Sequence, residues 1–250
     1  MPHFPHDTIK PFSQSESKKA QVQAMFDAIA RRYDFMNRFL SFGIDKSWRR
    51  KAIAVFKRDK PQHLLDVATG TGDMALRAAK MLHPQKITGI DLSENMLQIG
   101  RKKISNYKSA TQIELLQGDS ETINFGDDTF DGVMAAFGVR NFENLEQGLA
   151  EMRRVLKPGG LLVVLEFSKP KWPITKAFYT LYMGKIAPQA ARLFRQNKKA
   201  YEYLNCSANA FPDREQFVRI LTGAGYSDTS FKPLSLGICC IYTGRKPVEH

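Results

Sequence analysis

From residue 63 to residue 167 the chain alternates short, apolar segments with longer segments of helical periodicity. The short segments predict five strands: His63–Ala68, Lys86–Asp91, Gln112–Gln117, Phe130–Phe137 and Gly160–Phe167. The longer ones predict three helices: Gly72–Leu82, Glu94–Ser105 and Leu145–Leu156. Pro158-Gly159-Gly160 is expected to turn the third helix into the fifth strand. A repeated strand–helix–strand order places its helices on the faces of a parallel sheet, so it predicts an α/β fold covered on both faces.

The two ends of the chain depart from this alternation. Ahead of it, Ser17–Phe56 has apolar residues at helical spacing, and after it Lys169–Asn209 is helical, aromatic and basic in pattern. A helix at Asp213–Thr222 and strands near Thr229–Pro233 and Leu236–Thr243 then bring the predicted sheet to seven strands. We therefore divide the chain into an N-terminal helical segment (1–60), the α/β core (61–168), a helical lid insertion (169–210) and a C-terminal unit (211–250).

The composition limits the size of the core and the cellular location to be expected. With 250 residues and 43% hydrophobic content, the chain can bury one substantial core. It contains no run of 18 apolar residues and no apolar secretion signal, so a cytoplasmic location is expected. Cys206, Cys239 and Cys240 lack the spacing of a metal or redox motif, and we expect them to be reduced core residues. No metal site is expected.

A glycine-containing turn follows the first predicted strand. The sequence His63–Asp73 runs from an apolar strand through Gly70 and Gly72 into a helix. Glycines let the backbone approach a ligand closely, at the carboxyl ends of strands where open sheets bind ligands. Asp91 ends the second predicted strand, where a carboxylate can accept hydrogen bonds from both hydroxyls of a ribose. The pattern indicates a site for a nucleoside-containing cofactor.

Two classes of cofactor fit this pattern. Gly70-x-Gly72-x-x-Ala75 matches the dinucleotide fingerprint of a nicotinamide-dependent dehydrogenase. However, Asp73 enters the first turn of the helix, where its charge would repel a pyrophosphate. S-adenosylmethionine has no phosphate and carries a sulfonium and an ammonium, which Asp66 and Asp73 would attract. The charges favour S-adenosylmethionine, and the dehydrogenase is kept as an alternative.

Two further segments fall where the rest of this ligand and its acceptor would lie. Asp119 and Ser120 follow the third predicted strand, where Asp119 can accept from the adenine amino group and Ser120 can flank the ring; an ordinary polar turn is the alternative. The fourth predicted strand ends beside the expected sulfonium, so Gly138–Asn141 should face the acceptor. Arg140 could instead form a structural ion pair with Glu143.

Six stretches of the chain resemble the motifs of one known family: Phe26–Asn37, Ser41–Gly43 with Trp48-Arg49, Asp66–Asp73, Phe137–Asn141, Arg154–Gly160 and Leu165–Pro170. They are similar to the ubiquinone/menaquinone biosynthesis C-methyltransferases, a class I (Rossmann-like) methyltransferase family. The glycine turn is shared by all class I methyltransferases, whereas the first, fourth and sixth stretches are more specific. The resemblance covers nearly the whole chain, from about Lys18 to Arg245.

The resemblance implies S-adenosylmethionine as the methyl donor, with donor contacts at Thr71, Asp91, Asp119 and Ser120. Two positions depart from the family pattern. Ala68 stands where the first loop residue is often glycine, and Ala136 stands where many relatives have serine. The missing hydroxyl removes one possible donor contact.

The family reaction is methyl transfer to a ring carbon of a polyprenylated quinol, and the resemblance favours demethylmenaquinol, with a benzoquinol as the alternative. Deprotonating a ring hydroxyl pushes charge onto the ortho carbon, so the enzyme must stabilise a phenolate. We expect Arg140 to do so and Asn141 to orient the ring, with Tyr33 and Asp34 as weaker candidates for the proton acceptor. Positioning and electrostatics can supply most of the acceleration without a metal or a covalent intermediate.

The net charge of +12 bears on the partners of the protein. Between Phe167 and Tyr201 there is no acid, against eight cations: Lys169, Lys171, Lys176, Lys185, Arg192, Arg195, Lys198 and Lys199. We expect this basic, aromatic lid to hold the isoprenoid tail and to meet an anionic membrane, with a solvated basic cap as the alternative. A homo-oligomer is compatible with the sequence.

Two other functions remain as alternatives. A nucleic-acid methyltransferase would also be basic, but enzymes that methylate base amino groups usually carry an Asn/Asp-Pro-Pro-aromatic stretch after the fourth strand. Phe137–Asn141 has no proline there, so no nucleic-acid partner is expected. The other is a non-catalytic binding module that keeps the glycine turn and lacks a working acceptor site.

Overall fold

The computed structural model describes residues 4–13, 15–171, 173 and 198–248. Within these residues a seven-stranded sheet has the order β3-β2-β1-β4-β5-β7-β6. The strands are β1 His63–Val67, β2 Lys86–Asp91, β3 Gln112–Gln117, β4 Phe130–Ala136, β5 Leu156–Phe167, β6 Ser227–Leu234 and β7 Cys239–Arg245. The pairs within β1–β5 are parallel, and β7 is antiparallel to β5 and β6. The predicted α/β fold with a mostly parallel sheet is confirmed.

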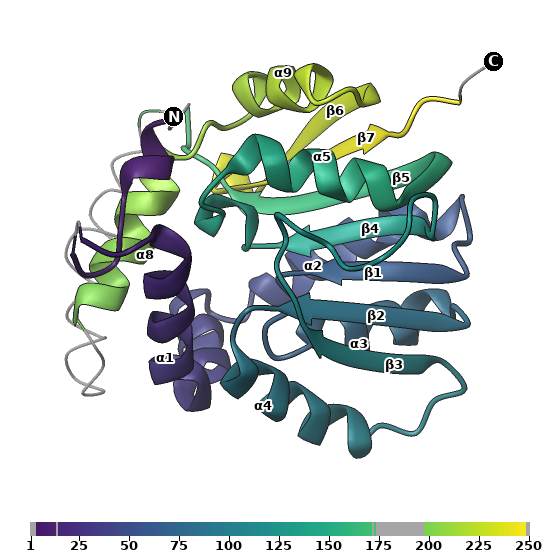
Figure 1. Ribbon diagram of the computed structural model, residues 1–250, viewed down its shortest axis with the longest axis horizontal. Coiled ribbons are helices and arrows are strands. Elements are labelled where there is room, and N and C mark those ends of the chain that lie inside the picture. Colours follow the sequence, from purple (N-terminus) through teal and green to yellow (C-terminus); the bar gives the residue numbers. More distant parts are fainter. Residues whose placement is uncertain (1–3, 14, 172, 174–197, 249–250) are drawn as a thin grey trace.

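Helices cover both faces of the sheet (Figure 1). The α-helices are α1 Lys18–Leu40, α2 Asp45–Ala54, α3 Asp73–Leu82, α4 Glu94–Ser105, α5 Leu145–Val155, α8 Lys198–Ala210 and α9 Glu215–Gly223. Alternate residues of β4 serve the two faces, because side chains of a strand point in opposite directions. Val133 and Ala135 belong to the core under α5 and α9, and Met134 to the core under α2 and α3.

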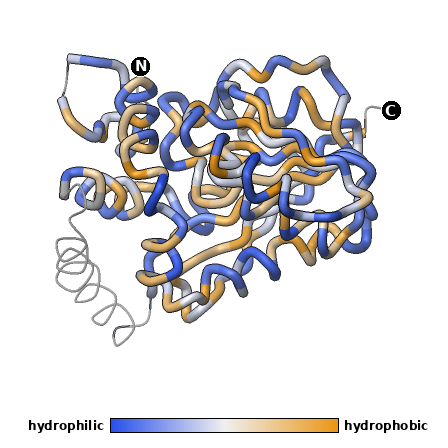
Figure 2. The backbone as a smooth tube through the Cα atoms, turned by 90° about the horizontal axis from the view of Figure 1, so that it is seen from below, coloured by the Kyte–Doolittle hydropathy of each residue, from blue (hydrophilic) through white to orange (hydrophobic). Residues whose placement is uncertain are grey.

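The helices have one apolar and one polar face. Hydrophobic and hydrophilic residues therefore alternate along them in the hydropathy-coloured tube of Figure 2. In α5, Leu145, Leu149 and Met152 recur at helical spacing and have no exposed surface. Fully burying such a side chain contributes about 1.5–3 kcal/mol, so these faces fix each helix on the sheet.

The fifth strand differs from its prediction. β5 begins at Leu156 rather than at Gly160, so the expected turn at Pro158-Gly159-Gly160 lies inside the strand. Gly159 donates its N–H to the carbonyl of Lys246 (2.8 Å), and Lys246 donates to the carbonyl of Gly160 (3.0 Å). These bonds hold the glycines against the chain after β7, and a register shift between Phe130 and Gly132 accommodates them.

Two of the three cysteines are core residues as expected. Cys239 and Cys240 are buried at the start of β7, next to β5. Cys206 is exposed on α8, so the expectation of a core position was wrong there.

The predicted N-terminal helical segment consists of α1 and α2 followed by the short 3-10 helix η2, Val55–Lys57. Ser17 caps α1 by accepting the N–H of Ala20 (3.2 Å). α1 lies beside the carboxyl ends of the parallel strands, where Figure 1 also shows α8. Most of the predicted lid, residues 174–197, lies outside the described residues. Within the described ones, no helix is both long and apolar enough to span a bilayer.

Candidate active site

The turn after β1 has the left-handed backbone that a close ligand approach requires. Gly70 and Gly72 have φ values of +56° and +74°, and Gly72 is the residue before α3. Ala68 also has a positive φ, +53°, so it occupies a conformation that glycine adopts more readily. A Cβ on Gly138 would lie 2.5 Å from the Cβ of Ala68. The methyl group of Ala68 therefore fills the space beside Gly138.

Asp91 joins this turn to the end of β2. Its Oδ2 accepts the N–H of Gly70 (2.8 Å) and its Oδ1 accepts the N–H of Ser93 (2.9 Å). Burial raises the pKa of Asp91 to about 6, against these hydrogen bonds. Each carboxylate oxygen keeps a lone pair, so Asp91 can still accept from two ribose hydroxyls.

Asp66 is a buried acid with one unsatisfied oxygen. Its Oδ2 accepts from the hydroxyl of Thr69 (2.6 Å) and the N–H of Ala75 (3.1 Å). Its Oδ1 is buried and has no hydrogen-bond partner, and burial raises the pKa of Asp66 to about 7. Asp66 lines a small pocket, the loop pocket, together with Thr71, Asp73 and Asp34. An unsatisfied carboxylate oxygen beside a pocket suits a cationic ligand such as an ammonium group.

A network of charged side chains fastens α1 to the loop pocket. Lys103 of α4 donates to Thr71 (2.9 Å) and to Asp73 (2.7 Å), and it also forms an ion pair with Asp34 of α1. Thr71 donates in turn to Asp34 (2.6 Å). Burial alone would raise the pKa of Asp73, but Lys103 lowers it. Because Lys103 balances Asp73, the repulsion of a pyrophosphate is weaker than the sequence implied.

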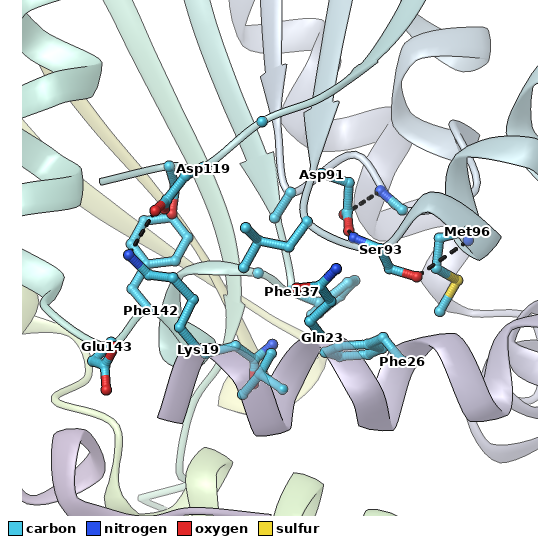
Figure 3. Close-up of a pocket in the computed structure, with 18 of the residues that line it drawn as sticks. Lys19, Gln23, Phe26, Asp91, Ser93, Met96, Asp119, Phe137, Phe142 and Glu143 are labelled. Atoms are coloured by element: carbon cyan, nitrogen blue, oxygen red, sulfur yellow. Dashed lines mark hydrogen bonds and ion pairs between the residues drawn. The ribbon is translucent and has the colours of Figure 1, made fainter. Parts of the chain in front are cut away.

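A larger pocket, the main pocket, adjoins the loop pocket. Tyr33, Ala68, Gly70 and Ala136 line both. Figure 3 shows Asp91 and Ser93 on one side of the main pocket, Asp119 on the other and α1 closing it from below through Lys19, Gln23 and Phe26.

An ion pair occupies the end of the main pocket at Asp119. Ser120, which is predicted to flank the adenine ring, lines this pocket. The Nζ of Lys19 lies 2.5 Å from Asp119 Oδ2 and 3.1 Å from Glu121 Oε2. Asp119 Oδ1 accepts the N–H of Glu121 (2.9 Å). An adenine amino group would therefore share Asp119 with Lys19.

The predicted acceptor residues lie on η3, Val139–Asn141, directly after the turn at Phe137-Gly138. Asn141 lines the main pocket and accepts from the hydroxyl of Tyr203 on α8 (3.2 Å). Arg140 is 3% exposed, and its Nη1 donates to Glu166 (2.7 Å) and to the carbonyl of Phe137 (2.7 Å). The ion pair with Glu143 is therefore wrong, because Glu143 accepts the backbone N–H of Lys18 instead.

Arg140 stands behind the pocket wall rather than in it. It is not among the residues that line the two described pockets, and its Nε is buried without a hydrogen-bond partner. Burial raises the pKa of Glu166, against the pull of Arg140, and Glu166 Oε2 also has no partner. The pair thus retains unsatisfied polar atoms next to Asn141.

One structurally important residue escaped the sequence reasoning. Lys18 has no exposed surface, and its Nζ donates to the carbonyls of His6 (2.9 Å), Arg140 (3.3 Å) and Phe142 (2.8 Å). Burial lowers the pKa of Lys18 to about 8. It ties the N-terminal 3-10 helix η1, Pro5–Thr8, to η3. A lysine at the start of an amphipathic helix gives no signal of burial, since that position is normally solvated.

Solved structures of known proteins have the same fold. A Thermotoga maritima S-adenosylmethionine-dependent methyltransferase, described as a possible histamine N-methyltransferase, matches with a TM-score of 0.62 at 19% identity, over 90% of this chain and 99% of the other. Phosphoethanolamine N-methyltransferase 2 of Haemonchus contortus, in complex with S-adenosyl-L-methionine, matches with a TM-score of 0.61 at 16% identity, over 95% and 62%. These likenesses show that the chain has the α/β fold of S-adenosylmethionine-dependent methyltransferases.

Sequence comparisons give the family. The model of the ubiE/COQ5 methyltransferase family matches residues 14–246. The chain is 42% identical to the demethylmenaquinone methyltransferase of Bacteroides fragilis, over 98% of this chain and 100% of the relative. It is 46% identical to the ubiquinone/menaquinone biosynthesis C-methyltransferase UbiE of Geotalea daltonii, over 92% and 97%. The chain belongs to the ubiE/COQ5 methyltransferase family, which confirms the resemblance and the predicted cofactor.

Proposed function

We propose that the protein transfers a methyl group from S-adenosylmethionine to a ring carbon of a polyprenylated quinol, converting demethylmenaquinol to menaquinol. The full-length similarity to the Bacteroides fragilis enzyme carries this proposal. A benzoquinol acceptor is the second candidate, because the Geotalea daltonii relative, whose name covers both quinones, is similar at the same level.

The proposal assigns the donor site to residues of both pockets. Bound S-adenosylmethionine supplies the methyl group on a positively charged sulfur. Asp91 would accept from its ribose hydroxyls, and the free Oδ1 of Asp66 would meet its ammonium. Asp119 and Ser120 would hold the adenine. Gly70, Thr71 and Gly72 would form the turn that lets the backbone approach the ligand.

At the acceptor end, Asn141, which lines the main pocket, would orient the ring. Arg140 lies behind the pocket wall and is paired with Glu166, so it would stabilise the phenolate form of the ring through its charge rather than by direct contact. A phenolate raises the electron density at the ortho carbon, where the new carbon–carbon bond forms as the carbon–sulfur bond breaks. The hydroxyl proton leaves as the phenolate forms, and Tyr33, which lines both pockets, and Asp34, paired with Lys103, are the candidates to accept it. After the methyl transfer the ring carbon loses its own proton and the ring oxygen regains one.

The lipophilic tail of such a quinol resides in a bilayer. We therefore also propose that the protein contacts an anionic membrane peripherally. The positive net charge supports this proposal, since cations near an anionic surface each contribute about 1 kcal/mol to binding.

A paired assay tests the function. The purified protein is incubated with methyl-labelled S-adenosylmethionine and either reduced demethylmenaquinone or the corresponding reduced demethylated benzoquinone. The proposal expects label in the naphthoquinol product, little in the benzoquinol and none with oxidised acceptors, which cannot form the phenolate. Equal or preferential labelling of the benzoquinol would contradict demethylmenaquinol as the acceptor. No labelling of either quinol would overturn the proposal.

A further inference from the structure

Lys18, the first residue of α1, holds the backbone on both sides of Asn141. It has no exposed surface, and its Nζ donates to the carbonyls of Arg140 (3.3 Å) and Phe142 (2.8 Å), the two neighbours of Asn141 in the chain. A third hydrogen bond goes to the carbonyl of His6 (2.9 Å). Because an ammonium has three N–H groups, backbone carbonyls use all the donors of Lys18.

The two peptide groups of Asn141 are both held. The N–H of Asn141 donates to the carbonyl of Gly138 (2.9 Å), and Lys18 binds the carbonyl of that same peptide group. On the other side the N–H of Phe142 donates to the carbonyl of Val139 (3.3 Å), while Lys18 binds the carbonyl of Phe142. These bonds fix the backbone angles of Asn141, and the backbone angles limit the direction of its side chain.

The side chain of Asn141 is directed into the site. It lines the main pocket, and its Oδ1 accepts from the hydroxyl of Tyr203 (3.2 Å). The amide nitrogen carries two N–H groups, which are the type of donor that an oxygen of a quinol ring accepts. A rotation of the backbone at Asn141 would turn this amide away from the pocket.

The N-terminal segment gives Lys18 a buried support. His6 of η1 has no exposed surface, and its ring meets the ring of Phe211 edge-on with the centroids 5.4 Å apart. Phe211 belongs to the core under α5 and α9. The backbone N–H of Lys18 donates to Glu143 (2.8 Å), so backbone and side chain both fasten the start of α1 to this region. Lys18 thus joins η3 to the core through η1.

Gln21, one turn after Lys18 on α1, is a buried polar side chain with different partners. It is 1% exposed. Its amide binds the backbone of Phe12, Ser13 and Glu16, which lie in the segment ahead of α1. Both side chains therefore fasten the N-terminal segment, and Lys18 also holds η3. A comparison of the two isolates the effect on η3.

We propose that Lys18 is a positioning residue of the acceptor site, which holds the backbone of η3 so that the amide of Asn141 faces the acceptor. This role rests on the proposed function, in which Asn141 orients the quinol ring. Lys18 is not among the residues that line the two described pockets, so it acts through Asn141 rather than by contact with a substrate.

Steady-state kinetics of Lys18→Met test this role in the full chain. Methionine has a similar length but cannot donate to the three carbonyls. At saturating donor and quinol, kcat should fall about 10–100-fold, the cost of a misplaced group near the reacting atoms. Calorimetric affinity for S-adenosylhomocysteine should stay within about twofold, because the donor contacts proposed at Asp66 and Asp91 remain. Lys18→Gln, which keeps two N–H donors, should give a smaller loss and replaces Lys18→Met if that variant does not fold.

A double-variant cycle separates positioning from stability. Asn141→Ala should itself lower kcat, and Lys18→Met should then lower it no further, because the side chain through which Lys18 acts is gone. Gln21→Met is the matched control: it should also destabilise the chain, since it leaves buried backbone groups without partners, but kcat should not change. Losses of kcat that multiply in the double variant, an equal loss in Gln21→Met, or a parallel loss of S-adenosylhomocysteine affinity in Lys18→Met would overturn the proposal.

The side-chain amide signals of Asn141 in heteronuclear NMR spectra give a measurement that needs no substrate. Their absence in Asn141→Ala identifies them. Lys18→Met should shift and broaden these signals, and Gln21→Met should leave them unchanged. Unchanged signals in Lys18→Met would overturn the proposal. If the signals shift but the native chain methylates neither quinol, the proposed function fails and the hold of Lys18 on Asn141 stands.

Discussion

The contact between Ala68 and Gly138 predicts a compensating pair of substitutions. Gly138 has φ −110° and ψ −40°, a backbone that alanine also adopts, so only the clash at 2.5 Å with the Cβ of Ala68 forbids a side chain there. The next nearest atoms would lie at 3.8 Å, an ordinary contact distance. Gly138→Ala should therefore be harmful in the native chain and harmless once Ala68 becomes glycine.

The magnitudes follow from the geometry. Forcing an extra methyl group into this contact costs about 1–3 kcal/mol. Ala68→Gly removes the strain of an alanine with a positive φ, which stabilises the folded chain by about 1–2 kcal/mol. The new glycine also stabilises the unfolded chain by about 0.5–1 kcal/mol, because it increases the conformational entropy of that state. The single Ala68→Gly change should thus be nearly neutral. The double variant should then be about as stable as the native chain, which makes the two effects non-additive by about 1–3 kcal/mol.

Urea unfolding of the four proteins measures this coupling. Calorimetric binding of S-adenosylhomocysteine gives a second measurement, because both residues line the main pocket. Gly138→Ala should weaken this binding, and Ala68→Gly should restore it in the double variant. Additive stability losses, or a double variant that still fails to bind, would refute the packing argument.

Three further predictions concern buried ionisable groups. Burial and the nearby charge of Lys18 lower the pKa of His6 to about 3. Between about pH 6.5 and pH 3 the unfolded chain therefore binds a proton that the folded chain does not, so the free energy of unfolding falls as the pH drops through that range. The loss should reach about 2 kcal/mol at pH 5, and His6→Phe should reduce it in pH-dependent urea unfolding. Arg140→Ala should cost about 3–5 kcal/mol by leaving Glu166 buried without its partner. Adding Glu166→Gln should recover part of that stability but no turnover, and full turnover in this double variant would exclude Arg140 from the reaction. Protonation of Asp91, whose pKa burial raises to about 6, should weaken donor binding below that pH, and Asp91→Asn should remove this dependence in calorimetric titrations.

The strands were predictable because their pattern is local. β2 and β3 have the predicted bounds, since the apolar residues of Lys86–Asp91 and Gln112–Gln117 lie between polar ends, and this holds even for β3, an edge strand in which only Leu115 is buried. The start of β5 was not predictable, because the bonds that hold Gly159 and Gly160 come from Lys246 beyond β7. The residues around Gly159 and Gly160 in the sequence do not indicate that distant contact.

The candidate site also has a part that the sequence predicts and a part that it does not. Gly70, Asp91 and Asp119 lie at or just after strand ends, so their meeting at one edge follows from the topology alone. The pairing of Arg140 with Glu166 depends on the adjacent ends of β4 and β5, where Glu143, close in sequence, was the simpler expectation.

A crystal structure with S-adenosylhomocysteine bound would test most directly the central claim that the two pockets hold the methyl donor. The pockets predict ribose hydroxyls on Asp91, the amino group within hydrogen-bond distance of Asp66 Oδ1 and the adenine beside Asp119. A ligand bound elsewhere, or one that leaves both Asp66 and Asp91 without contact, would contradict the account.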